Sequence, residues 1–218
     1  MMATTGSLAV LLSVLLTSTI VLAAPKKDLV VSLPSFGPPP TIQYSGFLDG
    51  TKGCDTATNG AFCKLHYWFA QAEGDASNKP VILWLNGGPG SSSILGFLQE
   101  NGPLLMNATG GLMENPWAWT KVANLFVLEA PVGVGYSYCA NQLKGKTCVN
   151  TDKYTASTSR AALVDFFSNK FPELAQNDFF ITGESYAGVY IPTLAKELLE
   201  HAPQINLVGL AVGGMSFR

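Results

Sequence analysis

Four stretches of the chain are continuously hydrophobic instead of alternating with polar residues. They read VILWL (81–85), NLFVLEA (124–130), DFFITG (178–183) and NLVGLAVG (206–213). Strands that are covered on both faces, as in a parallel sheet, have this pattern, whereas half-exposed strands alternate. The four runs therefore predict buried, mainly parallel strands.

Segments with helical spacing lie between these runs, at 92–100, 157–171 and 188–201. In the second segment, Leu163, Phe166, Phe167 and Phe171 fall on one helical face. Strands that alternate with helices in this way indicate an α/β fold with helices flanking a mostly parallel sheet.

The N-terminal part has a different pattern. Residues 8–23 are apolar or small apart from Ser and Thr, which indicates a signal peptide over 1–23 although no Lys or Arg precedes the run. The alternative is a membrane anchor, but a span needs about 20 apolar residues. Further on, 41–50 and 64–71 predict two antiparallel strands, and we expect residues 24–218 to belong to one domain.

Composition narrows the functional classes. The 218 residues are 47% hydrophobic with a net charge of −2 and no basic run, so we expect no nucleic acid partner. We find no cofactor or metal signature and no further membrane span.

A secreted chain can form disulfides, and we expect Cys54–Cys63 and Cys139–Cys148, although four cysteines allow three pairings. Asn107 lies in the only glycosylation sequon, N-A-T.

Ser185 is the candidate nucleophile. It lies in Gly183-Glu184-Ser185-Tyr186-Ala187, after a predicted strand and before a predicted helix. A catalytic serine is often presented on such a sharp strand-to-helix turn, which requires small neighbours. The helix N-terminus also favours the negative charge that develops during acyl transfer.

A glycine-rich loop, WLNGGPGSSS (84–93), directly follows the first buried strand. In α/β hydrolases, the equivalent loop supplies one oxyanion donor and the residue after the nucleophile supplies the other. We therefore assign the oxyanion hole to the amides of Gly88 and Tyr186. No Lys follows in the position that a phosphate-binding loop would require.

Together, these motifs resemble the serine carboxypeptidase family, and its cathepsin A branch above all. The resemblance rests on WLNGGPGSSS, ENGP, ENPWAWTKVANLFVLEAPVGVGYSY and TGESYAGVYIPTLA, with LHYWFAQAEG and INLVGLAVG. It implies an α/β-hydrolase fold and release of C-terminal residues from peptides at acidic pH. It also implies a lysosomal, vacuolar or extracellular location, and it allows for dimers among full-length relatives.

The same resemblance assigns Asn86, Glu100 and Glu184 to binding the terminal carboxylate of the peptide substrate. Glu100, Glu184 and the substrate carboxylate cannot all be ionised close together without a cost in free energy. We therefore expect the two glutamates to share a proton and to have raised pKa values. Carboxylate binding should then weaken when that proton is lost, which predicts an acidic optimum.

The base for Ser185 is missing from the pattern. The expected order is Ser, then Asp or Glu, then His, yet no Asp follows Ser185. His201 lies at the far end of the helix that follows the serine, and we expect it to be a surface residue. His66 precedes Ser185 in a strand, and we expect it to be structural.

We therefore interpret the chain as the N-terminal part of a serine carboxypeptidase, truncated after one strand beyond the nucleophile helix. The resemblance places the triad Asp and His in a missing C-terminal half, so the chain alone should be inactive. Two alternatives stay open: an acyltransferase on the same scaffold, and a catalytically inactive secreted protein. A lipase or esterase fits the neighbouring glutamates less well.

Overall fold

The computed structural model describes residues 24–214, so the predicted signal peptide, 1–23, lies outside the described residues. The main sheet contains seven strands. They are β1 (Gln43–Asp49), β2 (Cys63–Ala70), β3 (Val81–Leu85), β6 (Asn124–Leu128), β7 (Tyr138–Cys139), β8 (Phe179–Glu184) and β9 (Leu207–Gly213).

The sheet is mixed, with a parallel half that carries the candidate site. Its order is β1-β2-β6-β3-β8-β9, and β7 pairs with β2 at one end. Strands β6, β3, β8 and β9 run parallel, whereas β1 and β7 pair antiparallel with β2, and β2 pairs antiparallel with β6. The α/β prediction, including the antiparallel pair at the N-terminal edge, is confirmed.

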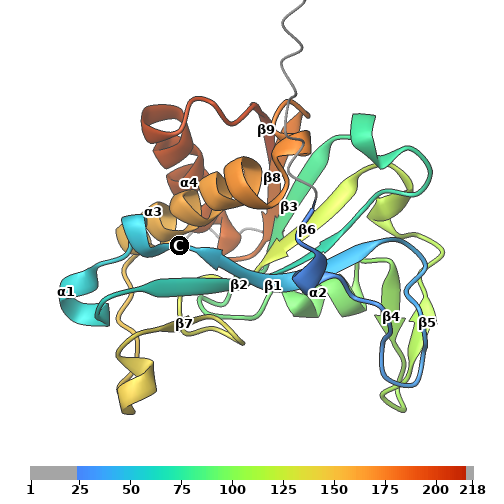
Figure 1. Cartoon of the computed structure of the whole chain (residues 1–218), viewed down its shortest axis with the longest axis horizontal. Helices are drawn as coiled ribbons and strands as arrows, with labels where there is room; N and C mark the ends of the chain where they lie inside the picture. The colour runs from blue at the N-terminus through green and yellow to red at the C-terminus, as the bar shows by residue number, and fades with distance from the viewer. Residues whose placement is uncertain (1–23, 215–218) are drawn as a thin grey trace, which may run out of the picture.

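Helices cover both faces of this sheet (Figure 1). They are α1 (Thr56–Asn59), α2 (Ile94–Gln99), α3 (Asp152–Asp165), which continues into a π-helical turn (Phe166–Lys170), and α4 (Ala187–His201). In β6, Phe126 and Leu128 belong to the core cluster that includes residues of α3 and α4, whereas Leu125 and Val127 pack with Phe97 of α2. Because successive side chains point to opposite faces, one continuous apolar run serves both layers.

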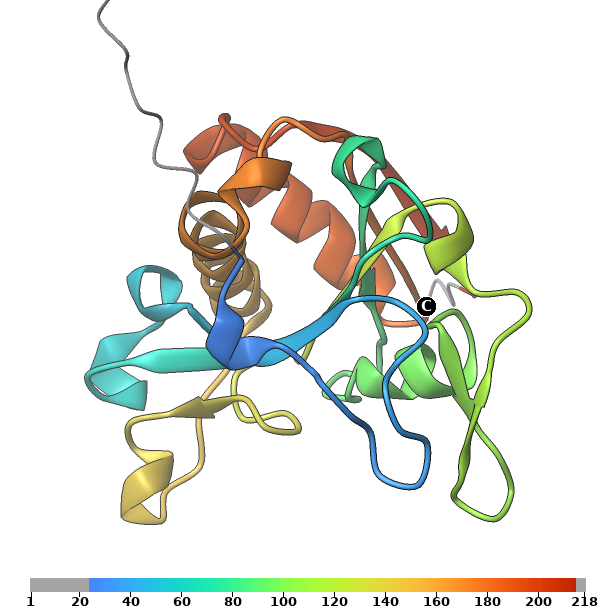
Figure 2. The same ribbon diagram turned by 45° about the vertical axis from the view of Figure 1, so that its right-hand side comes forward.

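Three elements differ from the sequence prediction. Helix α3 starts at Asp152 instead of 157, because the Thr151 side chain accepts a hydrogen bond from the Tyr154 amide and caps the helix. Strand β7 was not anticipated. Neither was the hairpin of β4 (Leu104–Met106) and β5 (Leu112–Glu114), which Figure 2 shows extending away from the sheet.

Strand β9 is less covered than its sequence predicts. Its residues are all half-buried or exposed, and Val208 and Leu210 are 53% and 49% exposed. The prediction of cover on both faces is therefore wrong for this strand within residues 24–214. Among the described strands, β9 pairs only with β8, and only its Leu207 and Val212 pack against the core cluster that includes residues of α3 and α4.

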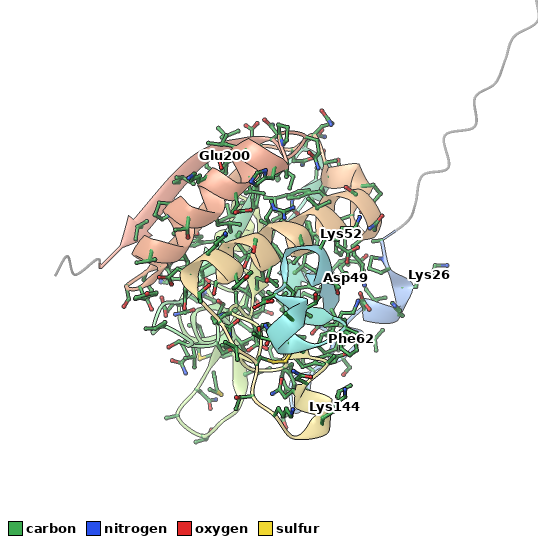
Figure 3. All side chains as sticks on the ribbon, turned by 90° about the vertical axis from the view of Figure 1, so that its left-hand side faces the viewer. Lys26, Asp49, Lys52, Phe62, Lys144 and Glu200 are labelled. Carbon is green, nitrogen blue, oxygen red and sulfur yellow. A yellow bond between two sulfur atoms is a disulfide. The ribbon has the colours of Figure 1, made fainter. Side chains whose placement is uncertain are left out.

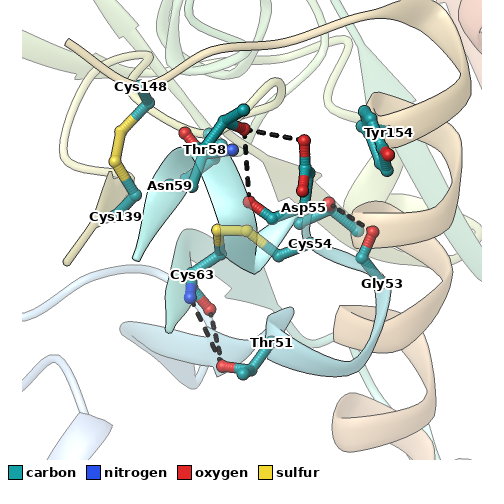
Figure 4. Close-up of a disulfide and its surroundings, with 12 residues drawn as sticks. Thr51, Gly53, Cys54, Asp55, Thr58, Asn59, Cys63, Cys139, Cys148 and Tyr154 are labelled. Atoms are coloured by element: carbon teal, nitrogen blue, oxygen red, sulfur yellow. Dashed lines mark hydrogen bonds between the residues drawn. A yellow bond between two sulfur atoms is a disulfide. The ribbon is translucent and has the colours of Figure 1, made fainter. Parts of the chain in front are cut away.

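Both expected disulfides are present (Figure 4). The Cα atoms are 6.1 Å apart in Cys54–Cys63 and 6.0 Å apart in Cys139–Cys148, which suits a disulfide. Because Cys63 and Cys139 are paired across β2 and β7, the two bridges are neighbours in one small buried cluster. Within residues 24–214, no helix is long and apolar enough to cross a membrane.

Candidate active site

Ser185 occupies a strained turn between β8 and α4. Its φ angle is 57°, a left-handed conformation that residues with a side chain rarely adopt. The Ser185 amide donates a 3.0 Å hydrogen bond to the Gly213 carbonyl in β9, and its carbonyl accepts from the Gly188 amide at 2.9 Å. A strained serine between a parallel strand and a helix N-terminus has the geometry expected of a nucleophile.

Small residues make this turn possible. A Cβ atom at Gly183 would overlap the Leu85 carbonyl oxygen and would lie 2.8 Å from the Ala187 side chain. The helix therefore packs onto the sheet at a distance that only glycine permits at this position. The sequence prediction of small neighbours for Ser185 agrees with this packing.

The loop that follows β3 lies directly against the serine turn. A Cβ atom at Gly87 would overlap the Tyr186 amide nitrogen and would lie 3.0 Å from the Ser185 Cβ. Gly88 has a φ of 110°, which glycine adopts without strain. The two segments assigned to the oxyanion hole, around Gly88 and Tyr186, are thus in contact.

Asn86 connects this loop to the residue before the nucleophile. Its side chain donates a 2.9 Å hydrogen bond to a Glu184 carboxylate oxygen. The other end of the amide is fixed, because Asn86 Oδ1 accepts from Trp84 Nε1 at 2.9 Å and from the Gly96 amide at 3.1 Å. Asn86 is buried, so these bonds determine which way its amide points.

Glu100 lies at the C-terminal end of α2 and is electrostatically coupled to this pair. Partial burial and the nearby charge of Glu184 raise the pKa of the Glu100 carboxyl, although a hydrogen bond with Asn86 opposes the shift. The structure therefore brings together all three residues that the resemblance assigned to carboxylate binding. Glu100 thus retains its proton to a higher pH than an ordinary glutamate does.

Several supporting residues were not anticipated from the sequence. Trp84 donates a hydrogen bond to the Asn86 side chain, and the Asn86 backbone amide donates to Ser93 Oγ. Tyr190 Oη accepts a 3.1 Å hydrogen bond from the Gly90 amide. Both Trp84 and Tyr190 are buried aromatic residues with a polar atom, which need a partner in the core. From the sequence alone, one could have predicted only that a buried Trp or Tyr requires a hydrogen-bond partner.

Neither histidine is positioned to act on Ser185. His201 ends α4, at the opposite end from the serine, and a 15-residue helix is about 20 Å long. Its neighbour Glu200 lies on the outer surface (Figure 3). His66 is in β2, where its ring contacts Ser45 and Glu129 instead. The Asn107 sequon lies in the exposed turn between β4 and β5.

Comparisons with known proteins agree with this geometry. The serine carboxypeptidase family model matches residues 34–216. The mouse lysosomal protective protein is 45% identical over 193 residues, covering 88% of this chain and 38% of that protein. Serine carboxypeptidase-like 21 of Arabidopsis thaliana is 41% identical over 217 residues, covering 94% and 42%.

The fold comparison leads to the same family. Kex1Δp, a prohormone-processing carboxypeptidase from Saccharomyces cerevisiae, superimposes with a TM-score of 0.76 at 26% identity, covering 89% of this chain and 44% of that chain. The chain thus has an α/β-hydrolase fold and spans less than half the length of these relatives. It belongs to the serine carboxypeptidase family.

Proposed function

We propose that the chain carries the nucleophile and the carboxylate-recognition residues of a serine-type carboxypeptidase that releases C-terminal residues from peptides. One observation above all supports this: the strained Ser185 directly follows Glu184, whose carboxylate is hydrogen-bonded to the buried Asn86. A site for the substrate's terminal carboxylate would therefore lie next to the atom that attacks the last peptide bond.

In this mechanism, Ser185 Oγ adds to the carbonyl carbon of the last peptide bond while a base takes its proton. The amides of Gly88 and Tyr186 stabilise the oxyanion, and one such donor is worth roughly 3–4 kcal/mol. The terminal amino acid leaves with a proton, and water then hydrolyses the acyl-enzyme. Neither His66 nor His201 supplies the base.

The carboxylate site gives the reaction its pH dependence. A proton on the Glu100 and Glu184 pair lets these acids donate to the substrate carboxylate instead of repelling it. Because the pKa of Glu100 is raised, that proton persists above the usual range of a glutamate. Affinity for a free carboxylate is therefore present at acidic pH and is lost as the pH rises through the raised pKa.

This function suits a protein of the secretory pathway, in a lysosome or vacuole or outside the cell. The two disulfides and the exposed Asn107 sequon support such a location. An Asn107→Gln variant that loses mass equal to one glycan would support glycosylation at this site. Unchanged mass would contradict it.

The decisive experiment uses the protein expressed from its full gene. The kcat/KM is measured from pH 4 to 8 for a dipeptide with a free carboxylate and for the same dipeptide with a blocked carboxylate. We expect Glu184→Gln to change kcat/KM for the free carboxylate at pH 5 and to weaken its fall toward pH 8, because the Gln amide donates a hydrogen bond at every pH and shares no proton with Glu100. The blocked substrate should change by less than about threefold, because Ser185 and its oxyanion donors do not use that proton.

Two further variants control this comparison. Ser185→Ala should abolish hydrolysis of both substrates, whereas the exposed Glu200→Gln should change neither. If both substrates respond alike to Glu184→Gln, Glu184 shapes the serine turn and does not bind the carboxylate. Acyl transfer to an added alcohol that outpaces hydrolysis would favour the acyltransferase alternative.

A further inference from the structure

Three polar side chains from neighbouring strands meet on the face of the sheet that α2 covers. Ser45 is in β1, His66 is in β2, and Glu129 follows β6. Each lies an even number of positions from a residue on that face: Ser45 from Phe47, His66 from Trp68, and Glu129 from Val127. The register places Glu129 directly opposite His66, whereas Ser45 pairs with Trp68 and is the diagonal neighbour of His66 on the same face.

The hydrogen bonds among them form a continuous relay. Ser45 Oγ lies 2.9 Å from His66 Nε2, and His66 Nδ1 lies 3.1 Å from a Glu129 carboxylate oxygen. A carboxylate can only accept, so Nδ1 carries the proton and its N–H donates a hydrogen bond to Glu129. In the neutral ring, Nε2 is then an acceptor, and the Ser45 hydroxyl donates to it.

The surroundings of Glu129 keep its carboxylate ionised. Burial opposes its charge, but hydrogen bonds from His66, Ser92 and the Tyr136 amide outweigh that effect and hold the pKa of Glu129 below its usual value. A charged carboxylate behind the ring fixes its tautomer and stabilises the imidazolium that forms when the ring takes a proton. A histidine in this setting can act as a general base.

The serine end of the relay faces a pocket. The pocket has a volume of about 400 Å³, and Ser45 and His66 line it together with Phe47, Trp68, Ile94 and Tyr136. The rings of Phe47 and Tyr136 flank the imidazole, with centroids 5.6 and 5.2 Å from it. Ser45 is only half-buried, so a small molecule can reach its hydroxyl. No residue of the Ser185 turn lines this pocket.

We propose that Ser45 is a second, base-activated nucleophile that accepts acyl groups from small, neutral aryl esters. Ser45 Oγ bonds to the ester carbonyl carbon, the bond to the aryl oxygen breaks, and His66 transfers the serine proton to the departing phenolate. The products are an acylated Ser45 and a phenol. Aryl esters fit because their leaving groups depart readily and because the walls of the pocket are aromatic.

The test removes Ser185 as a competing nucleophile. The Ser185→Ala protein is treated with 4-nitrophenyl acetate and, separately, with an alkyl fluorophosphonate, whose phosphorus bonds to an activated serine as fluoride leaves. We expect a burst of 4-nitrophenolate of about one equivalent. Peptide mapping by mass spectrometry should then find the phosphonyl adduct on Ser45.

Variants of the relay test whether His66 activates the Ser45 hydroxyl or only lies beside it. Adding Ser45→Ala should abolish the burst, whereas the exposed Ser32→Ala is a matched control that should leave it unchanged. His66→Gln retains hydrogen-bonding groups but provides no base, so labelling should slow by about 100-fold, the low end of general-base contributions. In His66→Ala, added imidazole should restore part of the rate, which no structural role would predict.

Folding of each variant is followed by near-ultraviolet circular dichroism. If the His66 variants unfold, Ser45→Cys replaces them, and its alkylation by iodoacetamide should exceed that of an unfolded control peptide at the same pH. A folded Ser185→Ala protein with no adduct at Ser45 overturns the proposal. So does an adduct that forms equally fast in folded His66→Gln.

Discussion

Glu100 and Glu129 show how the surroundings of a carboxyl group determine its charge. Glu129 is almost fully buried, yet three donors hold its pKa low. Glu100 is more exposed, yet partial burial and the charge of Glu184 raise its pKa. One acid is thus kept ionised and the other is kept protonated to a higher pH, which suits the proposed relay and the proposed carboxylate site, respectively.

Glu129 should make stability depend on pH at the acidic end. Its folded-state pKa is lowered, so its contribution to the free energy of unfolding is present above its ordinary pKa and is lost as the pH falls through the folded value. Glu129→Gln should cost about 1.5–3 kcal/mol at pH 5, because it removes a charged acceptor. The difference from the wild type should shrink as the pH falls below about 4.

Urea denaturation from pH 3 to 5 measures this effect. Glu200→Gln is the matched control, since Glu200 is exposed at the end of α4 and should leave the profile unchanged. A Glu129→Gln protein whose stability deficit stays constant down to pH 3 would show that Glu129 contributes through packing and not through its charge.

At the residue scale, the sequence locates the candidate nucleophile but not the residues that support it. Ser185 could be predicted because its strand, its small neighbours and its helix all lie close to it in the sequence. The contact between Asn86 and Glu184 joins residues 98 positions apart, and only the resemblance anticipated it. His66 appeared structural because Ser45 and Glu129, which flank its ring, come from other strands.

At the scale of elements, the loop after β3 and the turn before α4 depend on each other. Gly87→Ala introduces a Cβ that overlaps the Tyr186 amide and lies 2.9 Å from the Glu184 carbonyl oxygen. Both contacts are with backbone, so the loop must move. We expect a loss of about 100-fold in kcat/KM in the full protein, since a shift of roughly 1 Å costs about that much. Stability should fall by only about 1–3 kcal/mol.

Gly213→Ala is the matched control for this change. Gly213 accepts the hydrogen bond from the Ser185 amide, yet a Cβ there has a nearest neighbour 3.9 Å away. Activity and melting temperature of this variant should stay close to those of the wild type. If Gly87→Ala keeps full activity, the loop does not supply an oxyanion donor.

Elements were predictable where a single pattern determines them. The run at 81–85 coincides with β3, and the runs at 124–130 and 178–183 differ from β6 and β8 by one or two residues at an end. These strands are buried on both faces, so hydrophobicity alone defines them. Strands β4, β5 and β7 have only two or three residues each, which is too few to show a period.

At the scale of the whole molecule, the described part of the chain has one well-covered half and one open edge. The cluster that includes residues of α3 and α4 contains most of the large fully buried side chains. By contrast, Val208 and Leu210 leave apolar surface on β9. Exposed apolar sheet edges mark sites of association, and β9 is the part of residues 24–214 where we expect further packing.

The last prediction concerns peptide hydrolysis by the 218-residue chain alone. Ser185 has its strained turn, and the oxyanion segments are in contact with it, but neither histidine can take its proton. His66 is held between Ser45 and Glu129, and His201 lies at the other end of α4. Without a base, an oxyanion hole gives only a residual rate of roughly 10³–10⁴-fold over water, so we expect turnover at least about 10³-fold below that of a complete family member. The assay uses a blocked dipeptide at pH 5, with Ser185→Ala as the control that sets the background. Turnover within tenfold of the complete enzyme that disappears in Ser185→Ala would mean that a residue of this chain serves as the base, and the assignment of both histidines would then be wrong.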